Sequence, residues 1–202
     1  MKVVVQPNEY DTFEMRQRIR MVINQYEFTL PGGQPVCFVE QARFKFKEDI
    51  RFYADDSKQH ELMRLKARQR FDPSARYDVT AADGSPIGQI QKVFGACLLR
   101  STYTLFDASG QQTATVTERS LPIALIRRFI GLIPFIGGVV DWVPNPYHFN
   151  FLRGEQVLGT HERQKWKFRD TYTLDFSGDP GRTIDRRLVL ATAVGLDALQ
   201  AR

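Results

Sequence analysis

The chain has 202 residues, of which 43% are hydrophobic and 25% are charged, and its formal net charge is +5. This composition is ordinary for a globular protein and argues against a disordered chain or a protein with many membrane spans. The length fits one domain, residues 1–202, and the apolar run before Pro7 is too short for a signal peptide, so we expect a cytoplasmic protein. The pI near 9.3 favours a partner that carries negative charge.

Five stretches share one pattern, in which an aromatic residue and alternating apolar residues lead into a polar turn. They begin at Tyr26, Tyr77, Tyr103, Phe149 and Tyr172. Strict alternation around turns such as Gly-Gly, Asp-Gly or Ser-Gly predicts β-hairpins. A sixth, less regular copy begins near residue 50. The copies start roughly 25 residues apart, except between Tyr103 and Phe149, where roughly 20 extra residues intervene; such a period is typical of a repeated supersecondary unit. With a leading strand near residues 13–22 and a final strand near 167–176, the pattern predicts about twelve strands.

Basic residues occupy every second position in four strand-like segments. Period two places each set on one strand face, while Phe44, Leu65 and Trp166 occupy the opposite, core-directed face. The residues are Arg16, Arg18, Arg20, Arg43, Lys45, Lys47, Arg64, Lys66, Arg68, Arg70, Arg163, Lys165, Lys167 and Arg169. One interpretation is a solvated barrel exterior; the other is a binding site for anionic phospholipid, to which each cation adds about 1 kcal/mol. Nucleic-acid phosphates would satisfy the same charges and are the least favoured partner.

An apolar insertion at 120–145, SLPIALIRRFIGLIPFIGGVVDW in its main part, separates the fourth hairpin from the fifth. Its apolar residues fall on one helical face, with Arg127 and Arg128 opposite, so we expect a short amphipathic helix that ends before Pro134. The apolar residues are Leu125, Ile126, Phe129, Ile130 and Ile133. Two central arginines argue against a bilayer span. Two roles remain open: a cap over one end of the barrel, or a helix that contacts a membrane or a protein partner.

The tail at 184–200 breaks the hairpin period. Its centre, LVLATAVGL, is apolar around the whole helical circumference, so such a helix has to be surrounded. The run has about half the length that a bilayer requires, and Asp185, Arg186, Arg187 and Asp197 close its two ends. We therefore predict a mainly β fold, a closed antiparallel barrel around this central helix.

The ending TLDFSGDPGRTIDRRLVLATAVGLDAL and the basic-aromatic links ARFKF, KARQRF and ERQKWKF resemble those of the LURP-one-related proteins. That family belongs with the tubby-like C-terminal domains and the phospholipid scramblases. The resemblance implies a twelve-stranded barrel around a central hydrophobic helix, with phosphoinositide binding in tubby-like relatives and calcium-linked lipid movement in scramblases. The sequence lacks a palmitoylatable cysteine cluster and a proline-rich N-terminal tail, which argues against scramblase activity.

Three carboxylates, Asp175, Asp179 and Asp185, stand where scramblases place their proposed calcium-binding segment. Their spacing does not match an EF-hand and lacks its bidentate Glu. We expect these residues to serve a hairpin turn and a helix cap, and calcium to be only a secondary interpretation. Neither a metal nor a cofactor is expected.

No catalytic signature occurs in the chain. His60, His148 and His161 lie on separate hairpins, there is no HExxH or GxSxG motif, and Cys37 and Cys97 sit in apolar stretches as reduced core residues. We therefore expect no enzyme, but a domain that binds anionic phospholipid, peripherally at a membrane. The alternative is a protein-interaction or regulatory scaffold that uses the insertion, and an enzyme with a dispersed site is a remote third.

Overall fold

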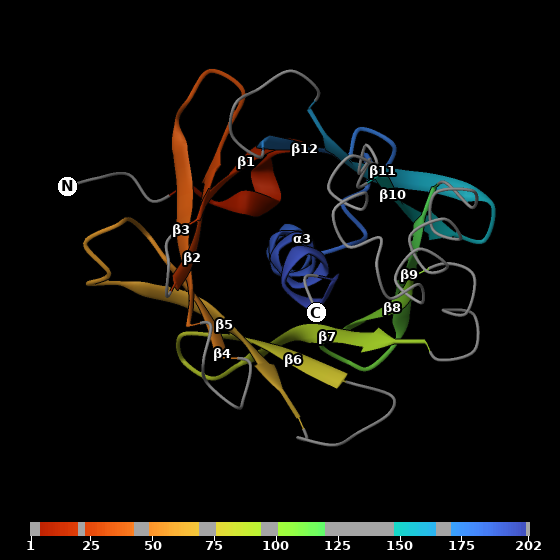
Figure 1. The fold of residues 1–202 in the computed structure, drawn as a ribbon. Helices are drawn as coiled ribbons and strands as arrows, with labels where there is room; N and C mark the ends of the chain where they lie inside the picture. Colours follow the sequence, from red (N-terminus) through yellow and green to blue (C-terminus); the bar gives the residue numbers. More distant parts are fainter. Residues whose placement is uncertain are drawn as a thin grey trace, which may run out of the picture.

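The structure is a computed structural model that describes residues 5–19, 23–42, 49–68, 76–93, 101–119, 148–164 and 171–200. Twelve strands form one closed antiparallel barrel in which each strand pairs with its neighbours in sequence and β1 pairs with β12 (Figure 1). The strands are β1 (Thr12–Ile19), β2 (Ile23–Thr29), β3 (Pro35–Ala42), β4 (Asp49–Tyr53), β5 (Glu61–Ala67), β6 (Arg76–Ala81), β7 (Pro86–Lys92), β8 (Thr102–Asp107), β9 (Gln112–Glu118), β10 (His148–Arg153), β11 (Gln156–Arg163) and β12 (Thr171–Asp175). A short 3-10 turn, η1 (Pro7–Glu9), precedes them, and a helix, α3 (Arg186–Gln200), follows.

The hairpin turns repeat one local device. In the β6–β7 turn, the Oδ1 atom of Asp83 accepts a hydrogen bond from the backbone N–H of Ser85, and Asp107 and Ser109 do the same in the β8–β9 turn. Asp is favoured in turns because its side chain can hold the backbone two residues on. Gly84 has φ +84°, which L side chains rarely adopt, so the Asp-Gly pair fits the turn.

The central helix begins at an N-cap that the sequence supplies. The Oδ1 atom of Asp185 accepts a hydrogen bond from the N–H of Arg187, two positions on, and the carbonyl of Asp185 accepts from the N–H of Val189. This is N-cap geometry, so the helix begins at Arg186 rather than at Ile184, two residues later than the sequence predicts. Leu190 and Val194 are fully buried, as the barrel that surrounds α3 in Figure 1 requires.

The barrel interior is packed with side chains from alternate strand positions. α3 lies close to β7, because a Cβ atom on Gly88 would come within 2.9 Å of the Leu188 side chain. On the other side aromatic rings fill the space; the rings of Phe151 and Phe176 pack edge to face with centroids 4.8 Å apart. Cys37 is buried and free, as expected of a reduced core cysteine, whereas Cys97 lies outside the described residues.

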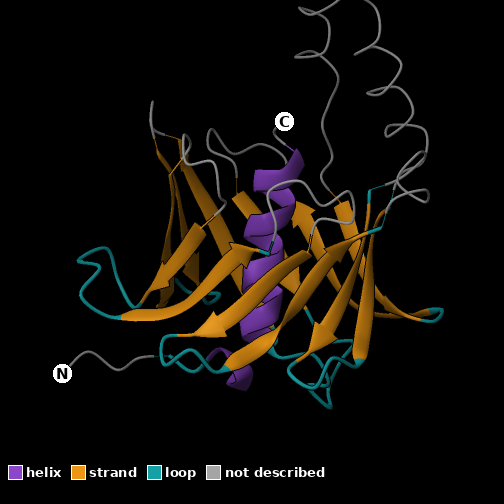
Figure 2. Cartoon of the chain, turned by 90° about the horizontal axis from the view of Figure 1, so that it is seen from below, coloured by secondary structure: helices purple, strands orange, loops and turns teal. Residues whose placement is uncertain are grey.

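The two ends of the barrel differ. The hairpin turns lie at one end, together with residues 5–11 and 176–185, and we call this the turn end. The other end, the link end, holds the strand ends that flank residues 20–22, 43–48, 69–75, 94–100, 120–147 and 165–170, which lie outside the described residues. Figure 2 shows α3 along the barrel axis, with its C-terminal part at the link end.

The predicted fold is confirmed in class, strand number and central helix. All the copies of the repeat form hairpins except the one at Tyr172, whose single strand β12 leads into the central helix instead of a second strand. The insertion at 120–145 lies outside the described residues, so its predicted helix stays a prediction. In the part of the chain that the structure describes, no helix has the length and apolar character needed to cross a membrane.

Candidate functional site

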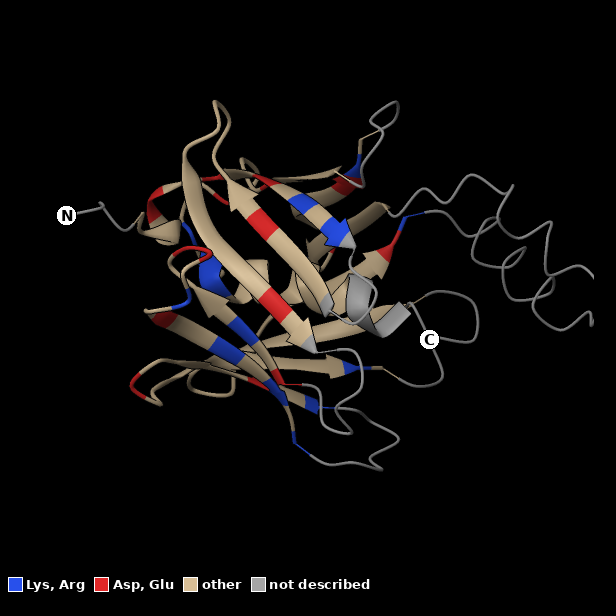
Figure 3. Ribbon diagram, turned by 60° about the vertical axis from the view of Figure 1, so that its left-hand side comes forward, with Lys and Arg blue, Asp and Glu red and all other residues tan. Residues whose placement is uncertain are grey.

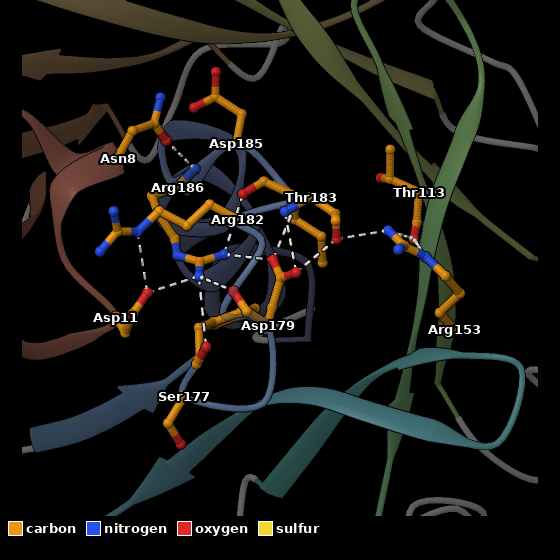
Figure 4. Close-up of polar contacts among 12 residues, drawn as sticks. Asn8, Asp11, Thr113, Arg153, Ser177, Asp179, Arg182, Thr183, Asp185 and Arg186 are labelled. Carbon is orange, nitrogen blue, oxygen red and sulfur yellow. Dashed lines mark hydrogen bonds and ion pairs between the residues drawn. The ribbon is translucent and has the colours of Figure 1, made fainter.

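A buried ion-pair network closes the turn end around Arg186, at the start of α3. Arg186 is one of the charges that end the apolar run of the helix, as the sequence shows, and its side chain is fully buried. Its Nη1 atom donates to Asp179 Oδ2 at 2.8 Å and its Nη2 atom to Asp11 Oδ1 at 2.9 Å (Figure 4). The guanidinium also lies 5.0 Å from the centroid of the Phe176 ring.

The carboxylate of Asp179 is saturated by donors of the protein itself. Besides Arg186, it accepts hydrogen bonds from the backbone N–H groups of Thr183 and Ile184 and from the Thr183 hydroxyl. Burial raises the pKa of Asp179, but these hydrogen bonds outweigh burial and hold the pKa below its ordinary value. The Arg186 side chain likewise lowers the pKa of Asp11.

The N-terminal segment is tied to the same network. The Oδ1 atom of Asn8 accepts a hydrogen bond from the Arg186 N–H at 2.6 Å, and the carbonyl of Tyr10 accepts from Arg186 Nε. Arg182 adds a hydrogen bond to the Glu9 carbonyl. The network therefore joins the first described residues to the start of the last helix, which makes it a structural latch.

The acidic loop does not gather around a common point. Asp175 accepts from the N–H of Ser177, as a turn residue, and Asp185 pairs with Arg187 and caps the helix, so both have the roles that the sequence predicts. Asp179 instead belongs to the buried latch. Within the described ranges no group of three metal-ligating side chains occurs, and Arg186 supplies the positive charge beside Asp179.

Most described cations on the outer wall are held in ion pairs. Arg64 contacts Glu61 and Asp49, and Arg68 contacts Asp78 at 3.0 Å. Acidic and basic side chains thus interleave on this side of the barrel (Figure 3). Lys66 is exposed, and no ion pair joins it to another described residue. Exposed pairs of this kind contribute little free energy, but each one reduces the charge that remains for an anionic ligand.

Arg163 does not lie on the outer face. It pairs in register with Tyr172 and follows His161 by two positions, and both of these side chains are buried in the barrel. The expectation that Arg163 lies on an outward strand face is therefore wrong; β11 ends at Arg163, and Lys165 lies outside the described residues. The remaining predicted cations lie outside the described residues: Arg20, Arg43, Lys45, Lys47, Arg70, Lys165, Lys167 and Arg169. The same holds for the insertion residues Leu125, Ile126, Arg127, Arg128, Phe129, Ile130 and Ile133.

The sequence segments that join strands at the two ends of the barrel differ in charge. The six sequence segments between the strand ends at the link end are 20–22, 43–48, 68–75, 93–101, 119–147 and 164–170, and they contain thirteen Lys and Arg and four Asp and Glu, a net charge of +9. The turn-end segments, 5–11, 30–34, 54–60, 82–85, 108–111, 154–155 and 176–185, contain two Lys and Arg and eight Asp and Glu, a net charge of −6. The chain as a whole carries +5. The strand order thus gathers basic segments that are far apart in sequence, which the sequence alone does not reveal.

His161 is buried in the barrel wall between aromatic rings. Its ring lies 5.1 Å from the Tyr172 ring and 6.4 Å from the Phe149 ring, and neither ring nitrogen has a hydrogen-bond partner among the described residues. Burial, with a smaller contribution from His148, lowers the pKa of His161 from 6.5 to about 3. His161 is thus a packed histidine. His148 and His161 lie on the two strands of one hairpin, β10 and β11, so the expectation that they lie on separate hairpins is wrong.

This burial predicts a pH-dependent stability. The unfolded chain binds a proton at His161 more readily than the folded chain does. The contribution of His161 to the free energy of unfolding is therefore complete above about pH 6.5 and is lost as the pH falls towards 3. Between pH 7 and pH 5 the free energy of unfolding should fall by about 2 kcal/mol from this group. Urea unfolding of wild type and His161→Phe at both pH values measures the difference. Equal losses in the two proteins would contradict the assignment.

Two comparisons with known proteins bear on this architecture. The family model described as LURP-one-related matches residues 36–197. The match covers ten of the twelve strands and the first part of α3, whereas β1, β2 and the Asp11 side of the latch precede it. A comparison with curated proteins found no matching relative.

Proposed function

This chain belongs to the LURP-one-related family, and we propose that it acts as a non-enzymatic domain that binds anionic phospholipid surfaces through the link end of its barrel. The observation that carries the proposal is the opposite charge of the two barrel ends. In the field of an anionic membrane such a molecule turns its basic end towards the surface. The contact is then made end-on.

The ion pairs of the outer wall favour the end over the sides. Arg18, Arg51 and Arg64 each lie within 3.6 Å of a carboxylate oxygen, so much of their charge is already neutralised. The link-end segments have three times as many basic as acidic residues and cannot be neutralised internally to the same extent. Strand faces are thus the weaker candidate for the contact, and the resemblance to tubby-like domains, which implies phosphoinositide binding in those relatives, supports the same class of ligand.

Vesicle co-sedimentation tests the proposal. Wild type should bind phosphatidylcholine vesicles that contain phosphatidylserine at about 0.15 M salt, and should not bind phosphatidylcholine alone. Because each cation near the membrane adds about 1 kcal/mol, neutralising four of them should weaken binding on the order of 10²–10³-fold. The variant carries Lys45→Gln, Lys47→Gln, Lys165→Gln and Lys167→Gln.

A matched control separates position from net charge. It removes the same number of cations from ion pairs of the outer wall and the turn end, through Arg51→Gln, Lys58→Gln, Arg64→Gln and Arg182→Gln. Vesicle binding of the control should stay within about threefold of wild type, because these charges are paired and lie away from the link end. Equal losses of vesicle binding in the two variants, or wild-type binding that does not depend on phosphatidylserine, would overturn the proposal. Competition by duplex DNA would reveal nucleic acid as the ligand instead.

A further inference from the structure

Among the described residues, one side of the barrel exterior carries no charge between its two ends. The outward residues of β7, β8, β9 and β10 alternate with buried ones, and none of them is Asp, Glu, Lys or Arg. The charged residues of these strands lie elsewhere: Glu118 is buried, and Lys92 pairs in register with buried Tyr103 on the inner face. Asp107 and Arg153 are the last residues of β8 and β10 at the turn end. Asp107 accepts hydrogen bonds within the β8–β9 turn, and the exposed Arg153 donates to the Thr113 carbonyl and the Thr183 hydroxyl. We call this outer face of β7–β10 the neutral wall.

The rest of the exterior is different. Each of the strands β1–β6 presents at least one charged residue outward; Glu27, Glu40 and Asp78 are examples, and their cationic partners surround them. Figure 3 shows this charged side. Charged surfaces keep barrels soluble and apart, so the absence of charge over four neighbouring strands requires its own explanation.

The register aligns neutral polar groups across the neutral wall. Gln91 lies opposite Thr104, Thr104 opposite Thr115, and Thr115 opposite Leu152, so one row crosses all four strands. A second row contains Thr117 opposite Asn150. All of these side chains are part-exposed, and Val157, at the margin beside Leu152, is the one large hydrophobic residue exposed among those described.

The chemistry of the neutral wall restricts what can cover it. Without cations it has no attraction for phosphate groups, and without carboxylates it has none for a basic peptide. Its few apolar side chains are too sparse for acyl chains. Hydroxyl and amide groups both donate and accept hydrogen bonds, so a surface made of them can pair with an identical surface in either role.

We propose that the neutral wall is the contact between two copies of this chain. In a two-fold contact the same patch of each copy faces the other. A charged residue near the axis would then face the identical charge of the other copy, and the neutral wall avoids that repulsion. Four strands about 4.8 Å apart and about 17 Å long give a small contact area, below the roughly 800 Å² per partner of stable complexes. The dimer is therefore weak and reversible.

Sedimentation velocity without lipid tests this inference independently of the membrane proposal. Between about 10 μM and 1 mM, wild type should shift from monomer to dimer, as expected of a weak contact. Thr104→Glu with Thr117→Glu should weaken the dimer at least about 100-fold, because like charges then face each other. The matched control, Thr12→Glu with Thr80→Glu, adds the same charges to the charged side and should dimerise like wild type.

A second variant tests whether the loss of the dimer comes from a folding defect or occurs only with negative charge. Thr115→Lys with Thr117→Lys adds positive charge to the neutral wall and should also stay monomeric, with a melting temperature close to that of wild type. Wild type that remains monomeric at about 1 mM would overturn the inference. So would a dimer that persists in either of the two neutral-wall variants.

Discussion

Leu190→Arg is expected to abolish folding. Leu190 is fully buried in the middle of α3, where barrel strands surround the helix on all sides. The substitution loses roughly 1.5–3 kcal/mol of apolar burial and adds an unpaired charge in the interior, which costs several kcal/mol more. Because a domain of this size is stable by only about 5–15 kcal/mol, we expect insoluble protein, or soluble protein without a cooperative thermal transition.

Val157→Arg is the matched control, because this side chain is 44% exposed. It introduces the same group on the outside of the barrel and should change the melting temperature by no more than a few degrees. Truncation after Gly181, which removes the helix altogether, should reproduce the defect of Leu190→Arg. A truncated chain that stays soluble and melts cooperatively would show that the barrel does not depend on its central helix.

Arg186→Ala should cost about 3–5 kcal/mol of unfolding free energy, the second large effect. The substitution leaves the buried carboxylate of Asp179 without its cation and removes a partner from Asp11. It also removes a hydrogen bond to the N-terminal segment, because the guanidinium donates to the Tyr10 carbonyl. Urea unfolding at pH 7 measures the loss.

The neighbouring Arg187 provides the comparison. Its side chain is 39% exposed and pairs with Asp185 at the surface, so Arg187→Ala should cost no more than about 1 kcal/mol. A double substitution of Arg186→Ala with Asp179→Ala should cost less than the sum of the single changes, because removing both partners leaves no lone buried charge. Similar small losses for Arg186→Ala and Arg187→Ala would refute the role of the latch.

Local sequence patterns were sufficient for the architecture. Alternation and turn residues set each hairpin, and a helix that is apolar on every side can be accommodated only inside other elements. The N-cap role of Asp185 and the turn role of Asp175 were predicted for the same reason, since their partners lie two residues away. These features need no knowledge of distant parts of the chain.

The latch could not be predicted, because its partners are distant in sequence. Asp11 and Asn8 lie 175 and 178 positions before Arg186, and nothing in the local pattern connects them. The sequence therefore identifies Arg186 only as one of the charges at the end of the apolar helix. The one local signal was the acidic Asp179 seven residues earlier, which the sequence equally supports as a turn residue.

The distribution of basic residues also depended on closure of the barrel. Period two assigns a residue to a strand face only if one strand continues through the whole run, and at Arg163 the strand ends. The gathering of basic links at one end follows from the antiparallel order, which sequence periodicity does not contain. For that reason the sequence favoured strand faces, whereas the contact that we propose is at the link end.

End-on membrane contact can be measured most directly by the depth of two fluorescent labels. One is attached to Ser101→Cys beside the link end and the other to Ala108→Cys in the β8–β9 turn, both in a Cys97→Ser background. Cys37 should not react, because it is buried and burial raises its pKa. On vesicles with phosphatidylserine and brominated lipid, the label at position 101 should be quenched and the label at 108 should not. Quenching at 108 alone, or equally at both positions, would contradict attachment through the link end.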